Sequence, residues 1–332
     1  MSKIRVAING FGRIGRVTTR QLMQHDNIEL VAINDLTDAH TLAHLLKYDS
    51  VHRAFPGEVH SVNDTISING KQVKVLSEKD PENLPWKELN IDVVIESTGF
   101  FRTEEDAGKH IKAGAKRVII SAPAKGDRVK SVVLGVNDDV LNGDEAIISN
   151  ASCTTNCAAP MVKIIDELCG IESGYITTVH SYTGDQRLHD APHTDLRRAR
   201  AAACSIVPTT TGAAKAITKI FPHLDGNLGG CGIRVPVPNG SLTDISCVVK
   251  NVQTVEKINQ AFKQAAAGEL KGILAYTEDP VVSIDIVGNT NSCIVDADLT
   301  SVIGNMVKVV GWYDNEMGYS TRLTDLIQKL YK

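Results

Sequence analysis

The sequence predicts an α/β protein whose first part is a parallel sheet covered by helices and whose second part is an α+β domain. Over the first 150 residues, strand-like and helix-like patterns alternate, which favours a parallel sheet with helices on both faces. After Ser149 the strand-like runs are separated by long polar connections, which favours an α+β arrangement. With 332 residues, 42% of them hydrophobic, the chain is long and apolar enough for two domains.

Local patterns predict the elements of the first part. The expected strands span residues 3–8, 28–33, 92–96, 117–121 and 131–135, and the expected helices span 13–24 and 38–48. Between them, residues 59–76 alternate between apolar and polar around Asn69 and Gly70, a pair typical of a hairpin turn. A further helix begins after Thr103, because Asp106 three positions on gives the spacing of a capping box.

The second part has fewer regular helices. Strand-like runs lie at 175–180, 232–237, 242–249 and 306–310, and helical patterns lie at 212–221 and 255–267. The chain closes with a helix whose apolar stripe is formed by Leu323, Leu326, Ile327 and Leu330. This stripe does not indicate which domain the closing helix packs on.

Composition argues against several classes of protein. Lys and Arg number 35 and Asp and Glu number 39, so a formal charge of −4 disfavours a general nucleic-acid or anionic-membrane binder. The longest uncharged stretch, residues 147–162, is rich in Ser, Thr and Asn, and the first residues lack the apolar core of a signal peptide. We therefore expect a soluble, cytoplasmic protein without a membrane segment or a nucleic-acid partner.

The cysteines do not indicate a disulfide framework. There are seven, an odd number, and their spacing is irregular. Cys153 and Cys157, four positions apart, could place two thiolates on one helix face. No second Cys or His pair follows at the spacing of a zinc site, so we expect no metal.

A glycine motif follows the first expected strand and opens the first expected helix. Gly10, Gly12 and Gly15 match the pattern G-x-G-x-x-G, and Asp35 stands about 20 positions past the last glycine, after the second strand. The three glycines would permit a tight turn, close approach of a pyrophosphate and close helix packing. A carboxylate at position 35 would bind ribose hydroxyls and repel a 2′-phosphate, so the motif predicts NAD over NADP. The alternative is a purely structural turn.

A reactive cysteine is the second candidate. The segment 149–157, SNASCTTNC, is small and polar and leads into an apolar helix. Cys153 would lie in the first turn of that helix, where the helix dipole lowers the pKa of a thiol. Cys157 is better interpreted as a small buried residue. His180 closes a strand before a polar loop and is the candidate base; a capping or surface histidine is the alternative.

Two features indicate a site for an anion. Thr211 and Gly212 precede a helix, so hydroxyl and free N–H groups meet at a helix N-terminus. Arg198 lies in an arginine cluster and Arg234 stands alone in a strand-like run, and arginine suits phosphate through paired hydrogen bonds. A solvated loop or a subunit contact is the alternative for the cluster.

Eight blocks of sequence together resemble one enzyme family. They read NGFGRIGR, IND, SNASCTTNC, TTVHSYT with DQ, DLRRARAA, PTTTGAAKA, RVPVPN and WYDNEMGYS, and they run in order from residue 5 to residue 320. In these blocks the chain closely resembles the phosphorylating glyceraldehyde-3-phosphate dehydrogenases. The resemblance covers essentially the whole chain, and each block is far more specific than the glycine motif alone.

The resemblance implies a fold, an assembly and a set of site residues. A Rossmann NAD-binding domain would comprise residues 1–150 and 316–332, and an α+β catalytic domain with a mostly antiparallel sheet would comprise 151–315. Cys153 would be the nucleophile, His180 the base, and the enzyme a homotetramer. The residues implied for NAD are Gly10, Gly12, Arg13, Ile14, Gly15, Asp35, Lys79, Ser121 and Asn315. Those implied for the substrate phosphate and inorganic phosphate are Ser152, Thr154, Thr183, Arg198, Thr211, Gly212 and Arg234.

The reaction that the resemblance implies is oxidation of D-glyceraldehyde 3-phosphate to 1,3-bisphosphoglycerate, with NAD reduction, through a hemithioacetal and a thioester on Cys153. Erythrose-4-phosphate dehydrogenase is the nearest alternative, but the intact PTTTGAAKA segment disfavours it. A protein that binds RNA or protein partners and has lost catalysis is the alternative from another class. The presence of both Cys153 and His180 disfavours that alternative.

Overall fold

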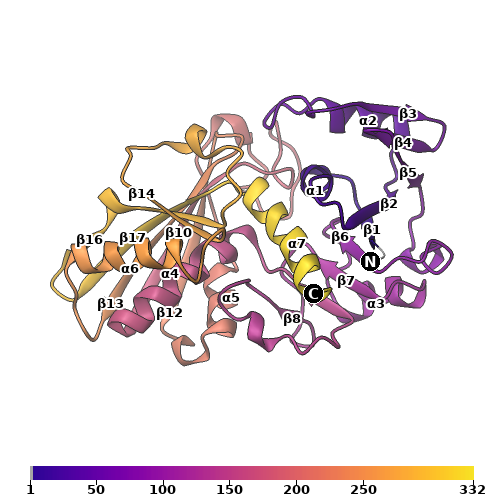
Figure 1. Cartoon of the computed structure of the whole chain (residues 1–332). Coiled ribbons are helices and arrows are strands. Elements are labelled where there is room, and N and C mark those ends of the chain that lie inside the picture. The colour runs from indigo at the N-terminus through magenta and orange to yellow at the C-terminus, as the bar shows by residue number, and fades with distance from the viewer. Residues whose placement is uncertain (1–2) are drawn as a thin grey trace. The chain divides into compact units, whose positions relative to one another are not determined.

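The computed structural model describes residues 3–332, and Figure 1 shows their secondary structure along the chain. The chain divides into two compact units, each with its own sheet and hydrophobic core. Unit 1 comprises the described residues up to Val132 together with residues 138–151 and 320–332, and unit 2 comprises residues 133–137 and 152–319.

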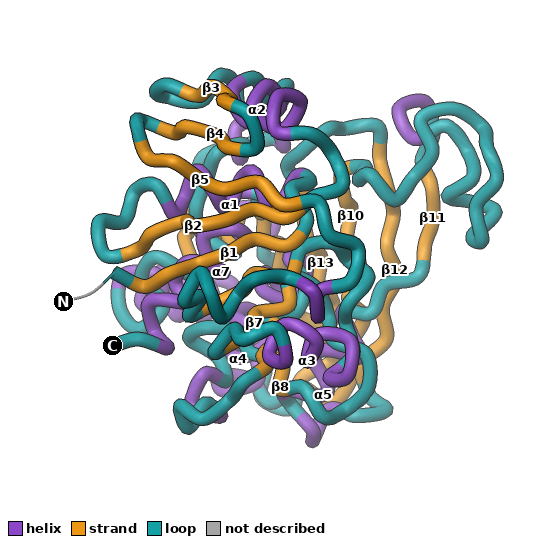
Figure 2. Tube along the Cα trace, turned by 90° about the vertical axis from the view of Figure 1, so that its right-hand side faces the viewer, coloured by secondary structure: helices purple, strands orange, loops and turns teal. Residues whose placement is uncertain are grey.

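Unit 1 is built on a largely parallel sheet. Among the described residues this sheet has nine strands, in the order β3-β4-β5-β2-β1-β6-β7-β9-β8. They are β1 Ile4–Asn9, β2 Ile28–Asn34, β3 Val59–Val62, β4 Thr65–Ile68, β5 Lys71–Leu76, β6 Val93–Glu96, β7 Arg117–Ile120, β8 Lys130–Ser131 and β9 Ile147–Ser149. Figure 2 shows β3, β4, β5, β2 and β1 side by side. Central side chains such as Val6, Ile8 and Val93 are fully buried, as is typical of a parallel sheet.

Local signals determine where the unit 1 elements begin and end. The helices are α1 Arg13–Leu22, α2 Ala39–Lys47, α3 Glu104–Lys112 and the end of α7 Met317–Leu330, with short 3-10 turns at Pro81–Asn83 and Asp138–Val140. Thr103 caps α3 by accepting a hydrogen bond from the N–H of Asp106 at 3.0 Å, which confirms the capping prediction. Asn69 and Gly70, with φ of 49° and 79°, join β4 to β5, which confirms the hairpin.

Side-chain hydrogen bonds place the end of the closing helix in unit 1. The hydroxyl of Thr321 in α7 donates to Oε1 of Gln21 in α1 at 3.3 Å. Further along, Nε2 of Gln328 donates to Oδ1 of Asn27 at 2.9 Å. The apolar stripe leaves open which domain the closing helix packs on. Contacts between segments about 300 residues apart in the sequence place its end in unit 1.

One predicted strand is wrong. The run at 131–135 is apolar, but only Lys130–Ser131 pairs in the sheet, with β9. The chain then turns, because the N–H of Val133 donates to Oδ1 of Asn137 at 2.8 Å. An apolar run of this length buries equally well in a turn, so its composition alone does not predict a strand.

The boundaries of the two units differ from the expected domain ranges in three places. Residues 133–137 and 316–319 belong to unit 2, and Ala151 belongs to unit 1. In the first segment, a Cβ on Gly135 would lie 2.8 Å from the side chains of both Leu270 and Ile273. This tight packing accounts for the placement of the segment in unit 2.

Unit 2 is built on a mixed sheet of eight strands within the described part of the chain. Seven follow the order β11-β12-β10-β13-β17-β15-β14, and β16 pairs with β17. They are β10 Ile171–Ser181, β11 Val207–Thr209, β12 Leu228–Val235, β13 Ser241–Val249, β14 Leu274–Thr277, β15 Cys293–Asp296, β16 Ser301–Ile303 and β17 Met306–Tyr313. Five of the seven pairings are antiparallel, which confirms the expectation of a mostly antiparallel sheet.

Helices of unit 2 pack on this sheet (Figure 1). They are α4 Cys153–Cys169, α5 Ala213–Ile220 and α6 Val255–Ala267, with short 3-10 turns at Ala202–Cys204, Pro222–Leu224, Ser283–Ile286 and Ala297–Leu299. Met161 and Ile165 of α4 are fully buried, and a Cβ on Gly311 of β17 would lie 2.8 Å from the Met161 sulfur. Close packing of α4 on β17 therefore determines where the first residue of α4 lies relative to the sheet.

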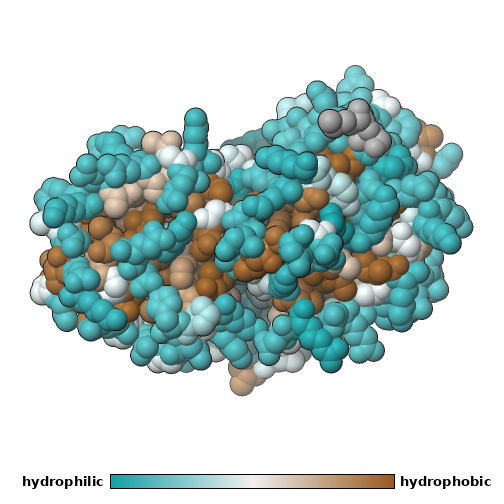
Figure 3. All heavy atoms as spheres, turned by 60° about the horizontal axis from the view of Figure 1, so that its bottom comes forward, coloured by the Kyte–Doolittle hydropathy of each residue, from teal (hydrophilic) through white to brown (hydrophobic). Residues whose placement is uncertain are grey.

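The surface mixes hydrophilic and hydrophobic side chains. On the face shown in Figure 3, hydrophilic residues surround several hydrophobic patches. Such patches are common on folded proteins and by themselves assign no function. Between residues 3 and 332, no helix combines the length and the apolar character needed to span a bilayer.

Candidate active site

The first candidate site lies where the glycine motif follows β1 in unit 1. Gly10 has φ +90°, and a Cβ there would lie 2.6 Å from the backbone nitrogen of Thr98. A Cβ on Gly15 would lie 2.4 Å from the carbonyl oxygen of Gly10, whereas no atom lies within 4 Å of the Cβ position of Gly12. Packing therefore requires glycine at positions 10 and 15. Gly12 instead leaves the backbone open to a ligand such as a pyrophosphate.

Replacement of Gly15 by alanine is expected to destabilise unit 1, because the added methyl group would overlap the Gly10 carbonyl oxygen. We expect the free energy of unfolding to fall by about 1–3 kcal/mol and NAD affinity to fall with it. Chemical denaturation and calorimetric titration with NAD measure the two effects. Gly12→Ala is the matched control, since open space there predicts stability close to that of the wild type. A Gly15→Ala protein of unchanged stability contradicts the packing argument.

A cavity of about 370 Å³ opens beside the glycine loop. It is lined by Asn9, Gly10, Gly12, Asn34, Asp35, Leu36, Glu78, Lys79, Ser97, Thr98, Phe100 and Phe101. The Asp35 carboxylate is held in the cavity wall, because it accepts hydrogen bonds from the N–H of Phe11 at 2.8 Å and of Thr37 at 3.0 Å. Apolar side chains beside a fixed carboxylate suit an adenosine whose ribose hydroxyls meet that carboxylate.

The structure brings together some of the residues expected to bind NAD. Those in the cavity lining are Gly10, Gly12, Asp35 and Lys79. The others lie elsewhere: Arg13, Ile14 and Gly15 in α1, Ser121 directly after β7, and Asn315 in unit 2. Their contacts with NAD stay predictions.

A buried polar network that the sequence analysis missed supports the cavity wall. Glu96, at the end of β6, accepts hydrogen bonds from Nδ2 of Asn9 at 2.6 Å and from the N–H of Thr98 at 2.8 Å. His110 Nε2 lies 3.0 Å from the same carboxylate, and Trp86 Nε1 donates to His110 Nδ1 at 2.9 Å. Because an indole can only donate, His110 carries its hydrogen on Nε2 and donates to Glu96. The sequence signal for this network is that polar residues, Asn9 and Glu96, stand at the ends of predicted parallel strands.

Arg13 forms an ion pair with a buried carboxylate. Its guanidinium donates to both oxygens of Asp49, at 2.7 and 3.1 Å, and the Asp49 side chain is 1% exposed. Burial acts to raise the pKa of Asp49, but hydrogen bonds from Arg13 and from the N–H groups of His52 and Val51 outweigh burial and lower the pKa to about 2. The carboxylate is therefore charged throughout the neutral range.

This ion pair predicts a pH dependence of stability. A carboxyl with a lowered pKa in the folded state contributes stability above its unfolded pKa of about 3.9 and loses it as the pH falls toward the folded value. We expect Asp49→Asn to lower the free energy of unfolding by about 1–3 kcal/mol at neutral pH, and this deficit to shrink below about pH 4. Unfolding by denaturant at several pH values measures this loss in the free energy of unfolding. Glu29→Gln removes an exposed partner of Arg5 and is the control, with a change of at most about 0.5–1 kcal/mol.

The second candidate site lies in unit 2, where α4 begins. Ser152 caps the helix by accepting a hydrogen bond from the N–H of Thr155 at 3.0 Å, which makes Cys153 the first helical residue. His180 lies near the end of β10 and is 5% exposed. Its Nε2 lies 3.5 Å from Sγ of Cys153. The fold thus forms the thiol–imidazole pair that covalent catalysis requires.

Burial acts on the pKa of both members of this pair. Burial raises the pKa of the Cys153 thiol and outweighs Arg234 and the Thr154 N–H, which lower it. Burial, followed by the charge of Arg234, lowers the pKa of His180 to about 3. The Thr154 N–H, at the start of α4, acts in the direction expected of a helix N-terminus, and burial acts against it.

His180 is held on its other side as well. Nδ1 lies 2.7 Å from the carbonyl oxygen of Ser181 and 2.8 Å from a guanidinium nitrogen of Arg234. The ring of Tyr313 packs edge-on against the imidazole, with ring centroids 5.9 Å apart. These contacts orient Nε2 toward Cys153.

Arg198 and Arg234 converge on the loop that follows β10. Arg234 donates to the hydroxyl of Thr183 at 3.1 Å, this hydroxyl donates to Asp185, and Asp185 accepts from Arg198. Burial acts to raise the pKa of Asp185, but Thr183 and the two arginines lower it by more. The cluster is therefore a cationic site that already holds one carboxylate. The role of Asp185 was not predicted from the sequence, where the DQ block is its only signal.

The other residues expected to bind phosphate differ in their surroundings. Thr211 precedes α5 and accepts a hydrogen bond from the N–H of Ala213 at 3.2 Å, and no atom lies within 4 Å of the Cβ position of Gly212. The hydroxyl of Thr154 is buried and lies 2.9 Å from the Tyr313 hydroxyl. The loop before α5 is thus open to a ligand, whereas the Thr154 hydroxyl bonds within the protein.

Asn315 is the second residue after β17 and is 5% exposed. Its Oδ1 accepts hydrogen bonds from the hydroxyls of Ser181 at 2.7 Å and Ser241 at 2.8 Å. Both acceptor positions of the amide oxygen are therefore used, and Nδ2 is the group that can donate to a ligand. The predicted contact with the nicotinamide carboxamide needs such a donor.

Cys157 packs as a small buried residue. It is fully buried, and its Sγ lies 3.6 Å from the carbonyl oxygen of Gly311. Across residues 3–332, His, Cys, Asp and Glu side chains form no cluster of three or more that could hold a metal ion.

Two family models match this chain. The model "Glyceraldehyde 3-phosphate dehydrogenase, C-terminal domain" matches residues 152–315, and the model of the NAD binding domain of the same enzyme matches residues 4–104. The chain is 57% identical to the glyceraldehyde-3-phosphate dehydrogenase of Geobacillus stearothermophilus over 325 residues, 97% of each chain. The chain belongs to the glyceraldehyde-3-phosphate dehydrogenase family.

Further members of the glyceraldehyde-3-phosphate dehydrogenase family are 54–57% identical to the chain. The chain is 57% identical to the Thermotoga maritima enzyme over 331 residues, 99% of each chain. It is 54% identical to the Borreliella burgdorferi enzyme over 337 residues, 99% of this chain and all of the relative. The family models confirm the expected pairing of a Rossmann domain with an α+β domain, and they confirm NAD as the cofactor.

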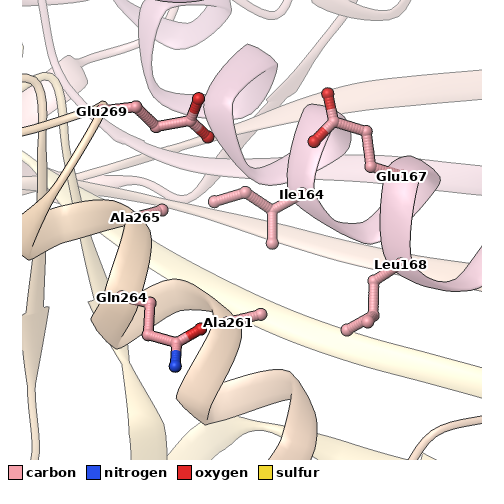
Figure 4. A pocket seen from close by; sticks show the side chains of 7 residues that line it. All are labelled: Ile164, Glu167, Leu168, Ala261, Gln264, Ala265 and Glu269. Carbon is pink, nitrogen blue, oxygen red and sulfur yellow. The ribbon is translucent and has the colours of Figure 1, made fainter.

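This member of the glyceraldehyde-3-phosphate dehydrogenase family also has a hollow of about 430 Å³ between α4 and α6 (Figure 4). It is lined by Ile164, Glu167, Leu168, Ala261, Gln264, Ala265 and Glu269. Ile164 lies about 16 Å along α4 from Cys153, at a rise of about 1.5 Å per residue. The lining holds no thiol, imidazole or guanidinium, so the candidate catalytic groups lie at the other end of α4.

Proposed function

We propose that the protein catalyses the NAD-dependent, phosphorylating oxidation of D-glyceraldehyde 3-phosphate to 1,3-bisphosphoglycerate. One observation carries this proposal: Cys153 and His180, 3.5 Å apart, lie beside Arg234, which also bonds the Thr183 hydroxyl. A nucleophile and a base next to an anion site suit an aldehyde that carries a phosphate group. The names of the relatives support this substrate.

The reaction begins on Cys153. Its sulfur attacks the aldehyde carbon while the thiol proton moves to Nε2 of His180, and a hemithioacetal oxyanion forms. The Cys153 N–H, at the N-terminus of α4, and the new imidazolium stabilise the oxyanion.

The unit 1 cavity fits a dinucleotide, because it combines open backbone at Gly12 with a fixed carboxylate at Asp35. NAD, when bound there, supplies the hydride acceptor that turns the hemithioacetal into a thioester. Asp35 would hold the ribose hydroxyls, and its charge disfavours the 2′-phosphate of NADP. Lys79 and Asn315 would add donors to the cofactor.

Inorganic phosphate then attacks the thioester carbon. The carbon–sulfur bond breaks, and the leaving sulfur takes the proton back from His180, while the acyl phosphate releases its own proton to water. We assign the anions to the donors of Arg198, Arg234, Thr183, Thr211 and Gly212, with Ser152 and Thr154 at the start of α4. Bidentate arginine contacts are strong enough to replace the present bonds to Asp185.

We also propose the cytoplasmic location and the homotetramer that the family resemblance implies. Sedimentation equilibrium of the purified protein tests the assembly: a mass four times that of the chain supports it, and a stable monomer contradicts it.

The activity is tested by following reduced nicotinamide absorbance after glyceraldehyde 3-phosphate and NAD are added, with and without inorganic phosphate. We expect sustained reduction that needs phosphate. Parallel reactions contain NADP or erythrose 4-phosphate. Preference for erythrose 4-phosphate with no need for phosphate would replace this proposal by erythrose-4-phosphate dehydrogenase, and no turnover would favour a binding protein.

A further inference from the structure

A chain of buried hydrogen bonds in unit 1 runs from the indole of Trp86 to the backbone of Glu78. An indole N–H can only donate, so Nδ1 of His110, 2.9 Å away, accepts and the ring hydrogen is on Nε2. Nε2 therefore donates to Glu96, 3.0 Å away. Trp86, His110 and Glu96 are at most 1% exposed, so solvent water does not compete for these groups.

Glu96 receives donors at both of its oxygens. Oε2 accepts from His110 and, at 2.6 Å, from Nδ2 of Asn9. Oε1 accepts from the N–H of Thr98 at 2.8 Å and from the Thr98 hydroxyl. Four donors on two oxygens leave no place for a proton, so this side chain is a carboxylate that only accepts.

The direction of the hydrogen bonds continues through two amides. Because Asn9 Nδ2 donates to Glu96, Asn9 Oδ1 is left to accept, and it accepts from Nδ2 of Asn34 at 2.7 Å. Asn34 Nδ2 also donates to the carbonyl oxygen of Glu78 at 2.9 Å, and Asn34 Oδ1 accepts from the Glu78 N–H at 2.8 Å. Turning either amide over would set donor against donor and acceptor against acceptor. One hydrogen position on His110 thus determines how the backbone of Glu78 is held.

The chain of hydrogen bonds ends in the wall of the cavity that fits a dinucleotide. The members that line this cavity are Asn9, Asn34, Glu78 and Thr98. Thr98 also packs on the glycine loop, since its backbone nitrogen lies 2.6 Å from the Cβ position of Gly10. Lys79, next to Glu78, lines the cavity and is one of the residues expected to bind NAD. The network therefore holds the cavity wall both at the glycine loop and at the loop after β5.

We propose that His110 is a positioning residue for NAD: its Nε2 hydrogen holds Glu96, and through Glu96 it keeps the cavity wall in the shape that the adenosine half of NAD needs. This inference rests on the proposed placement of NAD in the unit 1 cavity. His110 does not line the cavity, so its effect on NAD passes through Glu96 and the two amides. Without the His110 donor these groups rearrange, and NAD binding has to restore the wall at a cost in affinity.

Two replacements of His110 separate hydrogen bonding from space filling. His110→Phe keeps a ring beside Trp86 and Phe101 but has no donor for Glu96. His110→Gln loses the ring but keeps an N–H for Glu96 and an oxygen for Trp86. In calorimetric titration of the full-length protein, we expect the Kd for NAD to rise about 10-fold in His110→Phe and at most about threefold in His110→Gln. A side chain that only fills space predicts the reverse order. The reverse order, or an equal loss in both variants, overturns the proposal.

The affected half of the cofactor is identified by the same titrations with ADP-ribose, which lacks the nicotinamide. The ratio of Kd between His110→Phe and the wild type should be the same for ADP-ribose as for NAD. In turnover assays the KM for NAD should rise by the same factor, while kcat at saturating NAD stays within about twofold. A lower kcat at unchanged KM contradicts the inference. Absence of NAD binding to the wild type would refute the proposed function as well, whereas wild-type binding with equal loss in both variants refutes this inference alone.

Ile66→Ala controls for a general loss of stability. Ile66 is fully buried in β4 of the same unit and does not line the cavity. Its truncation should lower the free energy of unfolding but leave the Kd for NAD within about twofold. If Ile66→Ala weakens NAD binding as much as His110→Phe does, lost stability explains both variants and the proposal is wrong.

The hydrogen on His110 can be observed by magic-angle-spinning NMR of the sedimented full-length protein labelled with 15N-histidine, which separates protonated from unprotonated ring nitrogens. His110 is assigned as the signal lost in His110→Gln. We expect the hydrogen on Nε2, because Trp86 donates to Nδ1. A hydrogen on Nδ1 would reverse the first hydrogen bond of the chain and overturn the proposal.

Discussion

Replacement of Cys153 by serine is expected to reduce turnover by at least about 10³-fold. A serine hydroxyl is far less acidic than a thiol, and the pKa of its base, His180, is only about 3 in this environment. NAD affinity should change little, because the cavity assigned to the adenosine half is lined entirely by unit 1 residues. Steady-state rates of NAD reduction and calorimetric titration with NAD measure the two effects.

Cys204→Ser is the matched control, because Cys204 is exposed and lies in a short 3-10 turn of unit 2. Its activity should equal that of the wild type. Turnover retained in Cys153→Ser, or lost equally in both variants, would remove Cys153 from its role as the nucleophile.

Replacement of His180 by asparagine is expected to lower kcat by about 10²–10⁴-fold, because the thiol loses its proton acceptor. Asparagine can keep a hydrogen bond to Ser181 but has no basic nitrogen. The rate of Cys153 alkylation by iodoacetamide should fall as well, which a loss of substrate binding alone would not cause. Rates over a range of pH and alkylation kinetics are the measurements.

His223→Asn controls for loss of a histidine in the same unit. His223 is more than half exposed and pairs with Asp166, 2.7 Å away, so its loss should leave kcat unchanged. A His180→Asn enzyme with wild-type kcat would show that water or another group takes the thiol proton.

Predictions from local sequence were reliable where one short segment contains the whole physical cause. The cap at Thr103 and the turn at Asn69 and Gly70 depend on hydrogen bonds and φ angles within a few residues, and both are present. The start of α4 at Cys153 likewise depends on its neighbour Ser152. The resemblance blocks then supplied the family, because they combine many such local constraints.

Predictions failed where pairing or packing with a distant segment decides the structure. Strands β14 and β15 have only four residues each, and β15 exists because Ile294 and Val295 pair with Trp312 and Gly311 of β17. No strand was predicted at either segment. The strand predicted at 131–135 is wrong for the opposite reason. The segment has a strand-like composition, but nearly all of it has no partner strand.

The sequence by itself determined which chemical groups this protein has: a thiol at a helix start, a histidine at a strand end, arginines for an anion and a glycine loop with its acidic partner. Only the tertiary structure decided their electrostatic state. Burial acts to raise the pKa of the Cys153 thiol, against the effect of the helix N-terminus, and Ser181 and Arg234 both contact Nδ1 of His180. The physical reason is that desolvation and hydrogen-bond geometry depend on every segment packed around a group, and these segments lie far apart in the chain.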